Sequence, residues 1–103
     1  MKSTVVNIRS EECEVYIGRK KGEPNHFGNP FQIGKDGSRQ EVIRKFREWI
    51  NGIAYQNVEP ERRQWILQNL HLLEGKKLGC YCKPQSCHGD VYIEILDRMK
   101  QKL

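Results

Sequence analysis

The segment from Lys77 to Asp90 reads KLGCYCKPQSCHGD, and it predicts the unit on which the fold and the function of the chain depend. Its first residues, Lys77–Cys82, have the length and apolar content of a short buried strand. The loop Lys83–Cys87 follows, and a helix begins at about His88. The apolar face of that helix recurs at helical spacing, at Tyr92, Ile95, Leu96 and Met99. The segment therefore predicts a strand, a loop and a helix in succession.

Two more strands and two more helices are predicted before this segment. Thr4–Ile8 and Glu14–Gly18 contain β-branched and aromatic residues of the kind typical of strands. The capping box Ser38–Glu41 opens a helix that Gly52 ends, and a second helix extends over residues 59–75. The chain order β-β-loop-α-α-β-α predicts an α/β fold. We expect a small, mostly parallel sheet of three to five strands, packed by three helices in a Rossmann-like manner.

The bulk composition limits the class of protein. The 103 residues suit a single domain, 1–103, and a content of 37% hydrophobic and 30% charged residues excludes a disordered chain. No apolar run reaches the roughly 18–20 residues that cross a bilayer, and the N-terminus lacks the apolar stretch of a secretory signal. We therefore expect a cytoplasmic protein with no membrane partner. The net charge of +5 favours anionic partners, such as a nucleotide or a nucleic acid.

The spacing of the cysteines indicates thiol chemistry or metal binding rather than disulfides. Cys80, Cys82 and Cys87 fall within eight positions, whereas a disulfide framework spreads its cysteines to close loops. A helix N-terminus and a neighbouring cation lower the pKa of a thiol, so Cys87 beside His88 is a candidate reactive thiolate. A Cys-x5-Arg phosphate loop would require arginine at position 88, and thioredoxin chemistry prefers Cys-x-x-Cys. The sequence matches neither pattern.

Zinc is the alternative for the same cysteines. Cys80 and Cys82 would lie on one face of the strand, Cys87 would close the loop over the ion, and Cys13 or His26 would supply the fourth ligand. The usual paired Cys-x2-4-Cys spacing is incomplete, so we assign no metal ligand and expect no cofactor. A third interpretation is that Cys80 only fills the core as a small apolar residue.

The long loop Arg19–Gly37 is the second candidate region. Long loops inside compact domains are usually functional or mobile. Its Gly-Asn-Pro-Phe turn, Gly28–Phe31, would present the amide of Asn29 to a base or a sugar, and Arg19 would meet a phosphate. The alternative is an ordinary turn that its phenylalanines pin to the core.

Four segments together resemble a known family: Val15–Arg19, Gly28–Phe31, Leu78–Pro84 and Cys87–Asp90. Their pattern is similar to that of the domain of unknown function 4326 family, and the most specific block is Cys-x-Cys-x-Pro-x-x-Cys-His-Gly-Asp. The resemblance spans nearly the whole chain. It implies a compact α/β domain in a bacterial cytoplasm, or in the host cytoplasm for a phage-encoded protein, and it supplies no established reaction.

These observations predict a pocket between the Arg19–Phe31 loop and the Cys82–Asp90 turn. We expect a nucleotide or nucleoside there, in a binding protein or in an enzyme that acts at a glycosidic or phosphate centre. The candidate catalytic residues are Cys87, His88 and Asp90. The candidate ligand-binding residues are Arg19, Asn29, Lys83, Cys82 and Gly89. The alternatives are a non-enzymatic phage accessory protein that binds a host protein or nucleic acid, and a zinc-stabilised module.

Overall fold

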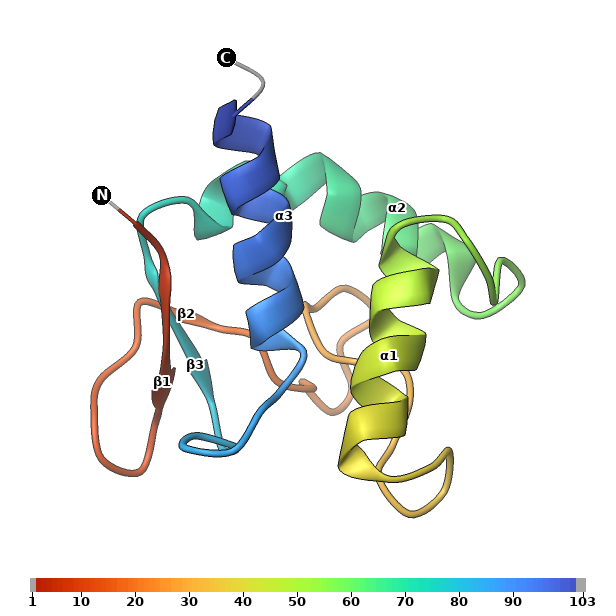
Figure 1. Ribbon diagram of the computed structural model, residues 1–103, viewed down its shortest axis with the longest axis horizontal. Helices are drawn as coiled ribbons and strands as arrows, with labels where there is room; N and C mark the ends of the chain where they lie inside the picture. Colours follow the sequence, from red (N-terminus) through yellow and green to blue (C-terminus); the bar gives the residue numbers. More distant parts are fainter. Residues whose placement is uncertain (1, 102–103) are drawn as a thin grey trace.

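A three-stranded parallel sheet organises the computed structural model, which describes residues 2–101 (Figure 1). Its strands are β1 (Thr4–Asn7), β2 (Val15–Tyr16) and β3 (Lys77–Cys80). Strand β3 comes last in the chain but lies in the centre, and the order across the sheet is β1-β3-β2. The parallel pairing agrees with the sequence-based prediction, although each strand is shorter than predicted.

The segment 8–14 explains how two consecutive strands come to flank a third. It crosses one face of β3 at Gly79, where a Cβ, if the residue carried one, would lie 2.5 Å from Cys13 Sγ and 2.6 Å from Ile8 Cγ2. Only glycine allows the crossing segment to come this close. Leu78 and Cys80 alternate with Gly79, so they point to the opposite face, where both are buried in the hydrophobic core.

Helix α1 (Arg39–Ile50) begins as the sequence predicts. The hydroxyl of Ser38 accepts a hydrogen bond from the backbone N–H of Glu41, and the Glu41 carboxylate accepts one from the backbone N–H of Ser38. This capping box satisfies two backbone donors and fixes the first turn of the helix beside the ends of the strands. The buried face of α1 consists of Val42, Phe46, Trp49 and Ile50.

The other two helices both contact α1, and one of them also contacts the sheet. Helix α2 (Pro60–Asn69) passes directly into a 3-10 turn, η1 (Leu70–Leu73), so the α-helix is shorter than predicted. Helix α3 (Gly89–Gln101) contacts β1 and α1, and Figure 1 shows α1 and α3 standing beside each other. The predicted apolar face of α3 is buried at Tyr92, Ile95 and Leu96, but Met99 is exposed because it lies in the last turns beyond the edge of the core.

The α/β class, the three helices and the small parallel sheet are thus confirmed. Within residues 2–101, none of the helices combines the length and the apolar character that a membrane crossing requires.

Candidate functional site

A pocket of about 390 Å³ lies where strands β2 and β3 end. Its walls come from the segment after β2, from the first half of α1 and from the segment between β3 and α3. Within residues 2–101, the lining includes two arginines and one histidine, but no aspartate or glutamate. The lining residues are Tyr16, Gly18, Arg19, Asn29, Phe31, Gln32, Ile33, Arg39, Val42, Ile43, Cys80, Tyr81, Cys82, Ser86, Cys87 and His88.

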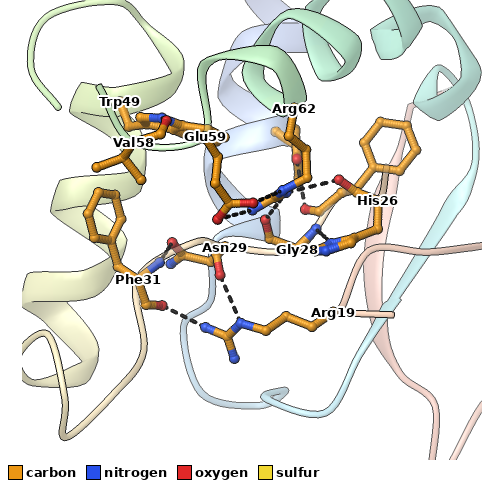
Figure 2. Close-up of polar contacts among 11 residues, drawn as sticks. Arg19, His26, Gly28, Asn29, Phe31, Trp49, Val58, Glu59 and Arg62 are labelled. Atoms are coloured by element: carbon orange, nitrogen blue, oxygen red, sulfur yellow. Dashed lines mark hydrogen bonds and ion pairs between the residues drawn. The ribbon is translucent and has the colours of Figure 1, made fainter. Parts of the chain in front are cut away.

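The segment His26–Phe31, here called the clamped loop, forms one border of the pocket. Its backbone carbonyl oxygens accept hydrogen bonds from side chains that come from other parts of the chain (Figure 2). Arg19 donates from Nε to the carbonyl of Asn29 at 3.0 Å and from Nη2 to the carbonyl of Phe31 at 2.7 Å. The exposed Arg19 side chain therefore stabilises the loop, and the Nη1 of Arg19 makes no hydrogen bond within the described residues.

Asn29 stabilises the same loop from inside. Its amide nitrogen donates to the carbonyl of Val42 at 3.0 Å, and its amide oxygen accepts from the backbone N–H of Phe31 at 2.9 Å. Asn29 lines the pocket as predicted, but it is buried and both polar atoms of its side chain bind backbone. These contacts give Asn29 a structural role, and a contact between its amide and a ligand stays a prediction.

Arg62, on helix α2, holds the far end of the clamped loop. Its side chain is only 3% exposed, and Nη1 donates to the carbonyls of His26 and Gly28 at 3.0 and 2.7 Å. Nε donates to the carboxylate of Glu59 at 2.8 Å, and the guanidinium lies over the ring of Trp49. The buried charge is therefore paired and hydrogen-bonded, as a buried cation must be.

His88 joins the clamped loop to the start of α3. Its Nε2 lies 2.8 Å from the carbonyl oxygen of Ile17 and 3.1 Å from that of Phe27. Carbonyls only accept, so Nε2 carries the proton and donates to both. Burial lowers the pKa of His88 to about 4, so the imidazole is neutral at pH 7. Its Nδ1 is then an acceptor, and it makes no hydrogen bond within residues 2–101.

The thiol loop, defined as Cys80–His88, forms another border of the pocket. The sulfur atoms of Cys80, Cys82 and Cys87 all lie within 4.8 Å of one another, and those of Cys80 and Cys87 are 3.4 Å apart. The predicted strand ends at Cys80 rather than at Cys82, because the chain turns at Tyr81. The three cysteines meet through this turn, and all three line the pocket.

The pKa values of the Cys80 and Cys87 thiols are shifted in opposite directions. A hydrogen bond from Cys87 lowers the pKa of Cys80, and the backbone N–H groups of Cys82 and Lys83 lower it further against the opposing effect of burial. The same hydrogen bond, together with burial, raises the pKa of Cys87. Cys80, which the sequence also allowed as a simple packing residue, is therefore the favoured thiolate of the pair.

Three predicted site residues lie outside the pocket lining: Lys83, Gly89 and Asp90. Lys83 Nζ donates to Asp90 Oδ1 at 2.9 Å, which raises the pKa of the lysine, and Asp90 Oδ2 accepts from the backbone N–H of Cys87 at 3.2 Å. A Cβ on Gly89 would lie within 2.9 Å of the side chains of Ile17 and Val5. These three residues thus fasten the thiol loop and α3 to the sheet.

Among the lining residues that sequence reasoning did not select are one arginine and two tyrosines. Arg39 occupies the first position of α1, and its Nη1 donates to the carbonyl of Ser86 at 3.1 Å. The rings of Tyr16 and Tyr81 meet edge to face, with centroids 6.3 Å apart. The position of Arg39 directly after the capping serine was the available signal, but only the fold brings that helix end beside the thiol loop.

Comparisons with known proteins give a family but no activity. A family described as "Domain of unknown function (DUF4326)" matches residues 2–98. The chain is also 34% identical, over 97 residues, to an "Uncharacterized 12.4 kDa protein in nrdA-td intergenic region" of Enterobacteria phage T4. That alignment covers 92% of this chain and 78% of the phage protein. No solved structure gives a significant match.

Proposed function

We propose that this chain, which belongs to the DUF4326 family, binds a nucleotide or nucleoside in the pocket between the clamped loop and the thiol loop. One observation carries the proposal. Arginines and aromatic rings line the same pocket, and no carboxylate from the described part of the chain lines it. Guanidinium groups recognise phosphate, and aromatic rings stack on nucleobases.

The charge of the pocket favours the phosphate of such a ligand. Arg19 and Arg39 line the pocket from different parts of the chain, the first after β2 and the second at the start of α1. Arg19 keeps Nη1 for a ligand while Nε and Nη2 hold the clamped loop in place. A guanidinium that is already fixed by two hydrogen bonds loses little conformational freedom when it binds an anion.

The size and the rings of the pocket favour the base. A volume of about 390 Å³ lies within the range of roughly 300–1,000 Å³ typical of small-molecule sites. Tyr16, Phe31 and Tyr81 offer aromatic surface, and Tyr81 is 54% exposed. The acceptor Nδ1 of His88 is suited to a base N–H or a sugar hydroxyl. The pocket also lies at the carboxyl ends of parallel strands, where Rossmann-like sheets bind ligands.

The proposal is for binding. Cys87, His88 and Asp90 stay predicted catalytic residues, and among residues 2–101 the lining offers no carboxylate that could act as a general base. Chemistry at a glycosidic or phosphate centre would have to use the thiols, His88 Nδ1 or a group that the ligand brings.

Calorimetric titration with nucleoside 5′-monophosphates, the matching nucleosides and inorganic phosphate tests the proposal. We expect at least one monophosphate to bind more tightly than its nucleoside and than phosphate. Arg39→Gln should weaken that binding about tenfold to a hundredfold, because it removes one charge-assisted hydrogen bond worth about 1.5–3 kcal/mol.

Arg44→Gln is the matched control, because Arg44 lies on the same helix but outside the pocket lining. The affinity of Arg44→Gln for the same monophosphate should equal that of the unmodified protein. Absence of binding by every compound at millimolar concentration, or equal losses in the two variants, would contradict the proposal.

A further inference from the structure

We propose that the three thiols of the thiol loop bind a zinc ion and leave its fourth coordination position open toward the pocket. The site consists of Cys80, Cys82 and Cys87. The inference stands apart from nucleotide binding, because the sulfur atoms lie close together whatever the pocket holds.

The spacing of the sulfur atoms fits a tetrahedral ion. A Zn–S bond of about 2.3 Å and tetrahedral angles place two sulfur ligands about 3.8 Å apart. The sulfurs of Cys80 and Cys87 are 3.4 Å apart, and no pair in the group exceeds 4.8 Å. Small side-chain rotations are enough to place all three around one ion. Binding replaces each S–H proton by the metal and releases the proton to solvent, so the step needs no oxidant.

A backbone donor already lies beside one of the sulfur atoms, as is usual for a thiolate ligand. The backbone N–H of Gly89 donates to Cys87 Sγ at 3.3 Å, at the first residue of α3. Hydrogen bonds of this kind orient metal ligands and stabilise their negative charge.

The candidate fourth ligands from the sequence lie elsewhere. Cys13 sits on the other face of β3, where it contacts the Gly79 side of the strand. The Nδ1 of His26 accepts from the backbone N–H of Gly28, and His26 is outside the pocket lining. Among residues 2–101, the group that the thiols form includes no imidazole or carboxylate.

The fourth position therefore belongs to water or to an atom of whatever enters the pocket. All three cysteines line the pocket, and Cys82 is the least buried of them. Three protein ligands with one open position are the arrangement of reactive zinc sites, whereas structural sites use four protein ligands. The ion would then present a Lewis acid to the ligand that Arg19 and Arg39 attract.

Metal titration of the full chain, reduced and purified without a metal-affinity tag, tests the inference. We expect one Zn²⁺ per chain in competition with a chromophoric chelator. Co²⁺ should give the intense visible bands of tetrahedral thiolate coordination. No stoichiometric Zn²⁺ at micromolar concentration would overturn the proposal.

Four cysteine variants locate the site. Cys80→Ser, Cys82→Ser and Cys87→Ser should each lower the affinity for Zn²⁺ by more than about a hundredfold, which exceeds the usual effect of a supporting residue. Cys13→Ser is the matched control and should keep full affinity and stoichiometry. If the variants of the two buried cysteines, Cys80 and Cys87, fail to fold, Cys82→Ser alone decides the test, because Cys82 is only half-buried. Equal losses in Cys13→Ser and Cys82→Ser would overturn the assignment.

Added azide distinguishes an open position from a closed one. Azide should shift the visible bands of the Co²⁺-loaded protein, because it replaces the water at the fourth position. Unchanged bands at saturating azide would show a fourth protein ligand and overturn the open-position part of the proposal.

Discussion

The clamped loop and the thiol loop border the same pocket, but they differ in the groups that they offer to a ligand. The carbonyl oxygens of the clamped loop accept hydrogen bonds from four side chains outside it: Arg19, Arg62, His88 and Tyr92. The thiol loop is held by similar long-range bonds, from Asn7 Nδ2 to the carbonyl of Lys83 at 2.6 Å and from Arg39 Nη1 to that of Ser86 at 3.1 Å. The two loops differ in the side chains that they place at the pocket. The sulfur atoms of the thiol loop meet one another beside the pocket.

The side chains that hold the clamped loop have a structural role, whereas the sulfur atoms of the thiol loop are available to bind a ligand or a metal. A donor that is engaged with a backbone carbonyl is lost to a ligand, and its removal leaves that carbonyl unpaired in the interior. A sulfur atom that faces a pocket keeps lone pairs for a ligand or a metal. Substitutions of the side chains that hold the clamped loop should therefore lower stability, and substitution of the half-buried thiol Cys82 should change binding with little effect on stability.

Arg62→Met should give the largest loss of stability. The substitution keeps much of the apolar volume but leaves the carbonyls of His26 and Gly28 without their donor and Glu59 without its cation. Each buried carbonyl left without its donor costs about 1–3 kcal/mol, so we expect a loss of about 2–6 kcal/mol in the free energy of unfolding, which urea denaturation measures. Arg44→Met is the control, since its exposed pair with Glu48 on α1 is worth less than about 0.5 kcal/mol. Similar losses in the two variants would show that the clamp does not support the fold.

His88→Phe should give the next largest loss. Phenylalanine preserves ring packing against Phe46 and Tyr92, but it removes the donor that binds the carbonyls of Ile17 and Phe27. Phe27 keeps its bond from the Tyr92 hydroxyl, whereas the carbonyl of Ile17 loses its side-chain partner. We expect a loss of about 1–3 kcal/mol in urea denaturation. Unchanged stability would mean that His88 is available for a role outside the clamp.

Local signals explain what the sequence predicted well. The capping box at Ser38 and the apolar spacing after it define α1 within a few residues, and the strand-loop-helix unit around the thiol loop follows from the same kind of pattern. The predicted pocket lies between the two loops because both follow strands, and parallel strands end at one edge of the sheet.

Long-range contacts explain what the sequence did not predict. An arginine on a helix is usually exposed to solvent, so the sequence gives no sign that Arg62 is buried. Its burial is favourable because it donates to the carbonyls of a loop more than thirty positions away. For the same reason Asn29 and Arg19 were predicted as ligand groups, although most of their donors bind backbone. The central place of β3 depends on the close crossing at Gly79, which no periodicity reveals.

Cys82→Ser tests whether a cysteine of the thiol loop contributes to metal binding rather than to stability. In protein treated with a chelator, this half-buried substitution should change the free energy of unfolding by less than about 1 kcal/mol, because serine keeps the shape and the backbone contacts of the turn. Thermal unfolding with and without Zn²⁺ measures both effects, and added Zn²⁺ should stabilise the unmodified protein but not the variant. A large loss in the metal-free state would place Cys82 among the supporting residues instead.

The ion pair of Glu59 with Arg62 gives the smallest effect, and it depends on pH. Hydrogen bonds from Arg62 lower the pKa of Glu59 in the folded protein. The pair therefore contributes fully above the ordinary carboxyl pKa of about 4.3, and the contribution is lost as the pH falls through the lowered value. The carboxylate is half exposed, so the contribution is less than about 1 kcal/mol.

Urea denaturation from pH 7 to pH 3 measures this contribution as the difference between the unmodified protein and Glu59→Gln. The gap should be constant near neutral pH and should narrow below about pH 4.5, as the carboxylate takes up a proton and resembles the amide. The same comparison in an Arg62→Met background should give a smaller gap with little dependence on pH, because the cation is gone. A gap that persists at pH 3 would show that the effect of Glu59 does not come from its charge.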